Sequence, residues 1–247
     1  GTGSVRSVCL VLGPCRNLTT LTASLAFLHP NCQVLNHAGL RILHDRSTDF
    51  LQNYSATCFQ RFVRYAMQIS KGGKRGSYGG SITLSHAFQD NGQVREIFER
   101  TGQPLLKKKI HCLFWKDPQR ITNHIRLSQI DFNRLFSENQ ELRFLLPIRN
   151  PLDCAVSNSK NATVKLLPSC HVGSTVDQIL PAILSELLWF VRLEADYPER
   201  FFHFFAYQLG GDLLRSLAQF LRLDPTPEWI EDALQAILEA RHLRSLV

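Results

Sequence analysis

The sequence lacks most features that mark specialised classes of protein. It has no CxxC pair among its seven cysteines, no repeat or low-complexity stretch, and no apolar run long enough to span about 30 Å of hydrocarbon. It does not open on a cationic segment followed by an apolar one, as a secretory signal does. These absences argue against zinc ribbons, disulfide frameworks and membrane spans, and unpaired thiols favour a cytoplasmic protein.

The composition is that of an ordinary globular protein, with 44% apolar and 20% charged residues in a chain of 247. We interpret residues 1–4 as a remnant of an expression tag and expect residues 5–247 to form a single domain. The formal charge of +7 favours an anionic ligand or partner. Because the basic residues are scattered instead of forming a stripe, we do not expect a nucleic-acid partner.

Short apolar runs alternate with segments of helical periodicity along the chain. The runs predict strands at 5–12, 32–35, 109–115, 141–148 and 201–205. The periodicity predicts helices at 19–28, 49–69, 176–195, 211–221 and 227–240. The glycine-rich segment 71–80 predicts a mobile basic loop. This alternation indicates an α/β fold of three layers, a central, mostly parallel sheet flanked by helices, in which ligands bind at the carboxyl ends of the strands.

The first candidate site is the segment Gly13–Thr20, which lies between the first strand and the first helix. Free backbone N–H groups and the helix dipole make such a turn an anion site, to which Arg16 adds charge and the two threonines add hydroxyls. It is not a Walker A loop, since Leu18 and Thr19 stand where that motif needs glycine and lysine. Taken alone, the segment is also compatible with an ordinary capped helix.

Two further candidates follow later strands. Arg149 ends a strand, and Ser157 lies eight residues after it, so a guanidinium and a helical hydroxyl can together hold a phosphate. Lys116 ends the strand before Asp117-Pro118, in the middle of the predicted sheet. A lone lysine at a strand end is usually solvated, and its place between the two phosphate motifs is what favours a functional role.

Together these motifs resemble the sulfotransferases that use 3′-phosphoadenosine 5′-phosphosulfate (PAPS). Residues 15–21 resemble the 5′-phosphosulfate loop of that family, with the basic residue, the paired threonines and the following leucine in place and Leu18 where the family has glycine. Arg149 and Ser157 resemble its 3′-phosphate segment. Lys116-Asp117-Pro118 resembles the Lys-Asp-Pro of tyrosylprotein and related sulfotransferases, and Tyr207 lies in a segment that looks like the family's Tyr-Glu-x-Leu.

The resemblance covers roughly residues 7–223, as four short motifs in the expected order. It implies a P-loop sulfotransferase-like fold that binds PAPS, with 3′-phosphoadenosine 5′-phosphate (PAP) as product and no metal. It implies that the 5′-phosphosulfate is held by Arg16, Asn17, Leu18, Thr19 and Thr20, and the 3′-phosphate by Arg149, Ser157 and Tyr207. Lys116 would face the transferring sulfuryl group. The family's basic-glycine segment that closes over the nucleotide is not evident.

The acceptor proton needs a base, for which histidine is the usual candidate. His37 lies 21 residues after Arg16, the spacing at which tyrosylprotein sulfotransferases carry their catalytic glutamate; His44 and His86 are the alternatives. The resulting hypothesis is sulfuryl transfer from PAPS to a hydroxyl, with a carbohydrate or small molecule favoured as acceptor. Two rival hypotheses are a degenerate sulfotransferase fold that binds nucleotide without catalysis, and an atypical P-loop kinase with Lys116 and Arg149 as phosphate clamps.

Overall fold

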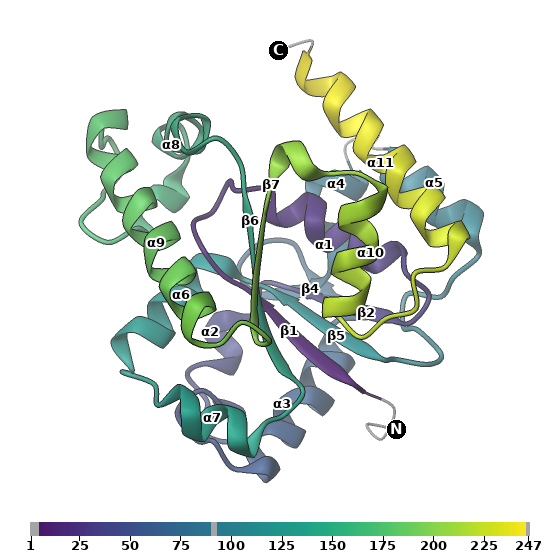
Figure 1. The fold of residues 1–247 in the computed structure, drawn as a ribbon, viewed down its shortest axis with the longest axis horizontal. Helices are drawn as coiled ribbons and strands as arrows, with labels where there is room; N and C mark the ends of the chain where they lie inside the picture. Colours follow the sequence, from purple (N-terminus) through teal and green to yellow (C-terminus); the bar gives the residue numbers. More distant parts are fainter. Residues whose placement is uncertain (1–4, 90–92, 246–247) are drawn as a thin grey trace.

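The computed structural model describes residues 5–89 and 93–245, and in this part of the chain seven strands form one sheet (Figure 1). Their order across the sheet is β3-β4-β2-β5-β1-β6-β7. The strands are β1 (Ser7–Val11), β2 (Cys32–Asn36), β3 (Gly73–Lys74), β4 (Gly79–Ser81), β5 (Cys112–Lys116), β6 (Leu142–Ile148) and β7 (Phe201–Phe205). Strands β2, β5, β1, β6 and β7 are neighbours in the sheet and run parallel to one another. Strands β4 and β3 extend the sheet beyond β2 in antiparallel pairing.

Helices cover both faces of the sheet. They are α1 (Thr19–Leu28), α2 (Gly39–Ile42), α3 (Ala56–Ile69), α4 (His86–Gln89), α5 (Gln93–Thr101), α6 (Pro118–Leu127), α7 (Phe132–Glu138), α8 (Pro151–Ser159), α9 (Val176–Asp196), α10 (Gly211–Phe220) and α11 (Pro227–Ser245). Short 3₁₀ turns lie at η2 (Ile82–Leu84), η3 (Ala162–Leu166) and η4 (Ala206–Gln208). In Figure 1, α1, α10 and α11 lie on one side of the strands, and α3, α7 and α9 lie on the other.

The two layers follow from the alternation of side chains along each strand. Val8, Leu10 and Leu12 point to one face of the sheet and pack into the core formed with α3, α6, α7 and α9. Cys9 and Val11 point to the other face and pack into the core formed with α1, α5, α10 and α11. Because both faces are covered, every residue of β1, β5 and β6 is buried. This explains why these strands are near-continuous apolar runs in the sequence.

The predicted three-layer α/β class is confirmed, and two local predictions are wrong. The helix expected over 49–69 begins at Ala56, because the Ser55 side chain caps it by accepting a hydrogen bond from the backbone N–H of Cys58 at 3.3 Å. The segment 71–80, predicted as a loop, forms the β3–β4 hairpin at the edge of the sheet. Glycines with φ of 97° at Gly73 and 86° at Gly79 allow the close backbone contacts of this hairpin.

Two further features of the described residues bear on function. None of the helices within 5–89 and 93–245 is both long and apolar enough to cross a membrane. All seven cysteines lie in these ranges, and each is unpaired.

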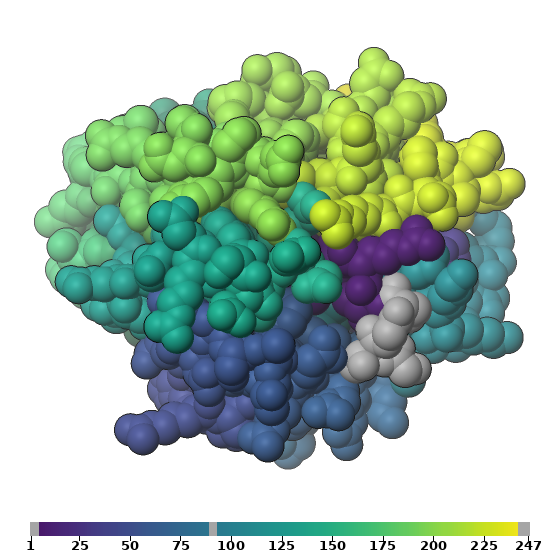
Figure 2. Space-filling model, turned by 60° about the horizontal axis from the view of Figure 1, so that its bottom comes forward, coloured from purple at the N-terminus to yellow at the C-terminus, as the bar shows by residue number. Residues whose placement is uncertain are grey.

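In the space-filling view, the N-terminal segment in purple comes to the surface between the C-terminal helices in yellow and the teal middle of the chain (Figure 2).

Candidate active site

The candidate residues meet where β1, β5, β6 and β2 end, at the carboxyl edge of the sheet. The loop after β1 starts at Gly13, whose φ of 95° a side chain would strain and whose added Cβ would collide with Leu146. Its N–H donates to Oγ1 of Thr122 in α6 at 2.9 Å. The loop is therefore fixed against both β6 and α6 before it turns into α1.

Leu18 is the residue at which α1 begins, and it has the left-handed backbone (φ 62°) that glycine adopts most readily. Its side chain is buried, with 6% of its surface exposed. Among the hydrogen bonds of the described residues, none is donated by the backbone N–H of Leu18, Thr19 or Thr20. Three adjacent N–H groups at the positive end of a helix make an anion site.

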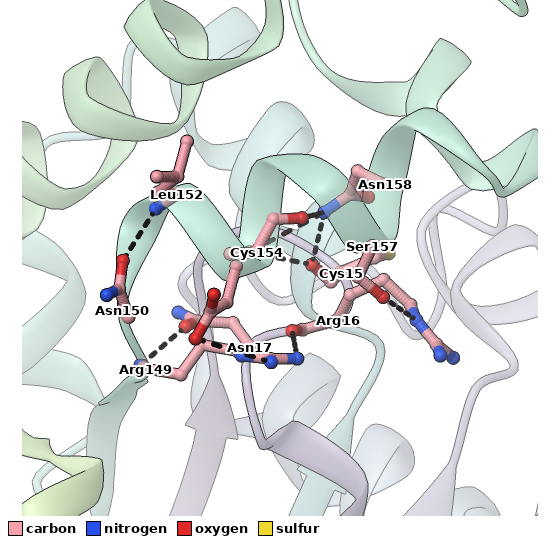
Figure 3. A network of polar contacts seen from close by, with 10 residues as sticks. Cys15, Arg16, Asn17, Arg149, Asn150, Leu152, Cys154, Ser157 and Asn158 are labelled. Atoms are coloured by element: carbon pink, nitrogen blue, oxygen red, sulfur yellow. Dashed lines mark hydrogen bonds and ion pairs between the residues drawn. The ribbon is translucent and has the colours of Figure 1, made fainter. Parts of the chain in front are cut away.

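The two predicted phosphate motifs lie in direct contact (Figure 3). Nε of Arg16 donates to Oγ of Ser157 at 3.0 Å, and Nη1 of Arg149 donates to the carbonyl of Arg16 at 3.4 Å. The backbone N–H of Arg149 donates to Oδ1 of Asn17 at 2.9 Å. The Arg149 side chain thus contacts the backbone of the β1 loop, and the Arg16 side chain contacts the helix that follows β6, so residues 133 apart in the sequence are joined.

The buried side chain of Asn17 lies at the junction of the β1 loop and β6. Its side chain is 1% exposed and joins the β1 loop to the end of β6, so it connects the two phosphate motifs. Its Nδ2 is buried with no hydrogen-bond partner among the described residues. A buried donor without a partner is costly, and it is consistent with a site built to bind a further acceptor group.

Helix α8 supports this loop with residues that the sequence did not single out. Asn150 caps the helix by accepting from the N–H of Leu152 at 2.9 Å (Figure 3). Asn158 then donates from Nδ2 to the carbonyl of Cys15 at 2.9 Å, and the thiol of Cys154 donates to the same carbonyl at 3.5 Å. Asn158 follows Ser157 directly, so the helix that presents the hydroxyl also fixes the loop.

Lys116 ends the central strand β5 and is 7% exposed. Burial lowers the pKa of its ammonium, the nearby Arg16 lowers it further, and Cys15 and Asp117 act in the opposite direction. No ion pair in the described residues includes Lys116. A buried ammonium without a carboxylate partner is costly, so an incoming anion gains more from it than from a solvated lysine.

His37 directly follows β2, whose last residue Asn36 is paired with Lys116 in the sheet. Its N–H donates to the carbonyl of Lys116 at 2.7 Å, and its own carbonyl accepts from the indole of Trp115 at 2.7 Å. His37 and Ala38 both have left-handed backbones, with φ of 61° and 73°. Two consecutive residues in this conformation cost strain energy, which is often stored at functional sites.

A carboxylate that the sequence analysis had not assigned a role lies beside this histidine. Oδ1 of Asp117 is 3.5 Å from Nδ1 of His37, and Oδ2 accepts from the N–H of Gly39 at 2.9 Å. Arg120 approaches the same carboxylate at 4.0 Å. A Cβ at position 39 would come within 2.6 Å of Oδ2, so the glycine is what allows the contact. The side chain of His37 is 31% exposed, which leaves its other face open to a ligand.

The other two histidine candidates lie elsewhere. His44 is an exposed residue after α2, and His86 is an exposed residue that begins α4. Of the three, His37 is the one that follows directly on a parallel strand, at the register of Lys116. The geometry therefore brings His37, Lys116 and the Arg16–Arg149 pair to one edge of the sheet.

Tyr207 lies in η4 after β7, 78% exposed, with its ring stacked on Phe205 at 5.5 Å between centroids. It lines an open pocket of about 420 Å³ together with Leu21 of α1 and Arg241 of α11. Leu21 lies in the first turn of α1, two residues after Thr19, where the helix begins. Arg241 donates to the carbonyl of Leu209 at 2.9 Å, which places a cation on its rim.

No protein-family model matches the sequence, and no curated protein matches it either. Solved structures that resemble the chain include sulfotransferase STF9 from Mycobacterium avium, at 13% identity over 95% of this chain and 68% of that one, with a TM-score of 0.45. The sulfotransferase domain of the curacin biosynthetic pathway matches at 14% identity over 92% and 78%, with a TM-score of 0.48. Retinol dehydratase in complex with androsterone and the inactive cofactor PAP matches at 13% identity over 94% and 64%, with a TM-score of 0.42.

Proposed function

We propose that the protein is a sulfotransferase that moves a sulfuryl group from PAPS to a hydroxyl of an acceptor. The observation that carries this proposal is the meeting, along one sheet edge, of two anion-binding motifs, a buried lysine and a histidine beside a carboxylate. The Arg16–Arg149 contact joins the motifs, and Lys116 lies between them and His37 in the order of the strands. The same order is needed to hold a donor, stabilise its leaving group and activate an acceptor.

The residues present fit a nucleotide that carries phosphates at both its 5′ and 3′ positions. The free N–H groups of Leu18, Thr19 and Thr20 lie at the start of α1, where a 5′-phosphosulfate would bind. Arg149 and Ser157 would hold the 3′-phosphate. The pocket of Leu21, Tyr207 and Arg241 is adjacent to the start of α1 and would take the adenine. Arg241 could thus supply the cation that the missing basic-glycine segment would otherwise provide.

PAPS supplies the sulfuryl group, whose bond to a 5′-phosphate oxygen breaks as the acceptor oxygen bonds to sulfur. His37 takes the proton of that acceptor hydroxyl at its exposed nitrogen, and Asp117 at the other nitrogen keeps the ring in the accepting orientation. Lys116 stabilises the negative charge that the departing phosphate oxygen gains with the electron pair. Basic side chains here do the work of charge neutralisation that magnesium does in kinases.

The rival kinase hypothesis needs a carboxylate free to hold magnesium. Asp117 lies 3.5 Å from His37 and accepts from the N–H of Gly39, and Asp153 lies 4.0 Å from the guanidinium of Arg149. A non-catalytic nucleotide-binding fold would bind PAP as the proposed enzyme does but would not transfer the sulfuryl group. A kinase would instead prefer ATP with magnesium, so a binding experiment separates these two rivals.

The experiment that tests the proposal is calorimetry of PAP, AMP and ATP with magnesium on the same protein. PAP should bind at least about tenfold more tightly than AMP, since a charge-assisted contact to the 3′-phosphate contributes about 1.5–3 kcal/mol. Ser157→Ala combined with Arg149→Gln should remove this preference and leave AMP binding nearly unchanged. Equal affinities for PAP and AMP would remove the 3′-phosphate site, and tighter binding of magnesium ATP would favour a kinase.

A further inference from the structure

The β3–β4 hairpin forms a basic surface next to the candidate base. Strand β4 pairs with β2 so that Gly80 lies opposite Asn36, and the turn of the hairpin therefore lies beyond Asn36, beside His37. Gly79 packs so closely on the backbone of Ala38 that a side chain there would collide with it. The hairpin turn thus borders the same edge of the sheet as the reacting centre.

Arg41 connects α2 to this hairpin. Its guanidinium lies 4.2 Å from the centre of the Tyr78 ring and 5.4 Å from that of Tyr65, and Nη1 donates to the carbonyl of Tyr78 at 3.4 Å. Nζ of Lys74 lies 5.7 Å from the same Tyr78 ring. Lys71 follows α3 and is exposed. We use the name hairpin surface for the four residues Arg41, Lys71, Lys74 and Tyr78.

The cations of the hairpin surface have no carboxylate partner: no ion pair of residues 5–89 and 93–245 includes Arg41, Lys71 or Lys74. The carboxylate of Asp117 lies 3.5 Å from His37, but Asp117 is 4% exposed and already accepts a hydrogen bond from the N–H of Gly39. Uncompensated positive charge beside an active site attracts anionic ligands and excludes cationic ones.

These cations lie on the opposite side of His37 from the donor site. Along the sheet the donor motifs follow β6 and β1, Lys116 ends β5, and His37 follows β2. The hairpin surface lies around the β3–β4 hairpin at the next edge, with Arg41 joined to it from α2. From β1 to β4 is three strand steps, or about 14 Å at the usual strand spacing. The hairpin surface therefore stands where the acceptor has to approach, not where the nucleotide binds.

We propose that the acceptor is an acidic oligosaccharide, bound with one hydroxyl at His37 and its carboxylates on Arg41, Lys71 and Lys74. This rests on the proposed function for the chemistry at His37. The hairpin surface is open, and the Tyr78 ring is 52% exposed, so the apolar face of a sugar ring can pack on it next to the cations. An acidic oligosaccharide carries carboxylates spaced along an extended chain. These carboxylates can contact the separated cations of the hairpin surface while a sugar ring packs on Tyr78.

The test compares two hexasaccharides of equal length on the PAP-bound protein: a hyaluronan hexasaccharide, which carries carboxylates, and chitohexaose, which is neutral. Three exposed charge pairs should together give hyaluronan a preference of about tenfold in Kd. Arg41→Gln combined with Lys74→Gln should reduce that preference severalfold and leave the Kd for PAP within about twofold. Lys71→Gln combined with Lys74→Gln tests the same effect while the Arg41 stacking stays intact.

Lys108→Gln combined with Lys109→Gln is the matched control, with the same loss of charge at exposed positions before β5, at the amino edge of the sheet. It should leave the preference unchanged. Equal binding of the two hexasaccharides, or a preference that survives in both hairpin variants, would overturn the proposal. Weaker PAP binding in the hairpin variants would assign the surface to the donor. A peptide of acidic residues around a tyrosine that binds more tightly than the hyaluronan hexasaccharide would replace the carbohydrate by a peptide.

The outcome is separable from that of the proposed function. If PAP does not bind the parent protein, the donor site is wrong, and the hexasaccharide comparison made without PAP still decides on the hairpin surface. If PAP binds and the two hexasaccharides bind equally, the donor site stands and the acidic acceptor is wrong.

Discussion

Nδ1 of His37 lies 3.5 Å from Oδ1 of Asp117, and the other oxygen of that carboxylate is fixed by the backbone of Gly39. The histidine ends up beside the carboxylate because β2 and β5 pair in a register that places Asn36 opposite Lys116. A carboxylate at one imidazole nitrogen fixes the ring's tautomer and orientation and leaves the other nitrogen able to accept a proton. Asp117 is therefore a positioning residue for His37.

The first prediction concerns this carboxylate. Asp117→Asn keeps an oxygen for the Gly39 N–H and removes the charge that faces His37, so turnover should fall by about 10–100-fold while the Kd for PAP changes little. Single-turnover PAP release and calorimetry measure the two quantities. Asp212→Asn is the control, an exposed carboxylate in α10 whose loss should change neither. A variant with parent turnover would reduce the His37–Asp117 contact to a structural one.

The second prediction tests the base itself. His37→Asn removes the imidazole at a position with φ of 61°, a conformation that asparagine tolerates well, so the backbone should stay in place. Turnover should fall by about 10²–10⁴-fold, the usual contribution of a positioned base, and PAP affinity should stay nearly the same. Matched variants His44→Asn and His86→Asn should retain turnover. If one of them loses it and His37→Asn does not, the base is misassigned.

The third prediction separates chemistry from binding at Lys116. Lys116→Met keeps the buried volume and removes the ammonium, whose charge matters most as the leaving oxygen becomes negative. Turnover should fall by about 10²–10³-fold, and PAP affinity should fall far less. Measured kcat and calorimetric Kd on the same preparation give both values. An equal loss in affinity and turnover would place Lys116 at a ground-state phosphate contact and away from the reacting oxygen.

Local patterns were sufficient to predict the elements whose ends carry local signals. Helix α1 occupies residues 19–28 as predicted, because Gly13-Pro14 ends the strand before it and His29-Pro30 ends the helix. The helix predicted from residue 49 begins later because long-range contacts, not local signals, fix the segment before it. Phe50 and Leu51 are buried and mimic helical periodicity, but the side chain of Asp49 pairs with His124 of α6 at 2.8 Å, a contact between distant segments.

Some residues of the candidate site could likewise be predicted from local sequence, and others could not. Arg16, Arg149 and Lys116 could be found because each follows a strand and strand ends are visible in the sequence. The contacts of Asn158 with Cys15 and of Asp117 with His37 depend on how α8 packs and on which strands pair. No local pattern carries that information, since the pairing order of parallel strands is set by long crossover connections.

The fourth prediction concerns Leu18, where the resembled family has glycine. Leu18→Gly relieves about 1–2 kcal/mol of left-handed strain and loses about 2–5 kcal/mol of buried packing, so unfolding free energy should fall by a net 1–3 kcal/mol or so. PAP affinity should stay within about threefold, because the leucine side chain is already buried. Urea unfolding and calorimetry measure the two. A gain in affinity of about tenfold would show that the Cβ obstructs the phosphate.

The last prediction concerns a buried cation away from the active site. Nζ of Lys107 lies 4.2 Å from the centre of the Phe27 ring and 5.0 Å from that of Phe98, it donates to Oε1 of Gln103, and the residue is 3% exposed. Burial lowers the pKa of its ammonium from 10.5 to about 8. In the unfolded chain the pKa returns to the ordinary value, so between about pH 8 and 10.5 the unfolded state binds more protons than the folded one.

Unfolding free energy should therefore rise with pH through that window, and the penalty of the buried charge, about 3 kcal/mol from the shift, should be fully present at pH 7. Lys107→Met keeps the packing of the stem and removes the charge. It should stabilise the protein by about 1 kcal/mol at pH 7 after the lost contacts to Gln103 and the rings are subtracted, and should lose that advantage near pH 10. Urea unfolding at both pH values measures this, with exposed Lys108→Met as the control that should change little. A variant that is less stable at pH 7, or equally stabilised at both pH values, would show that the Lys107 ammonium is well accommodated in the fold.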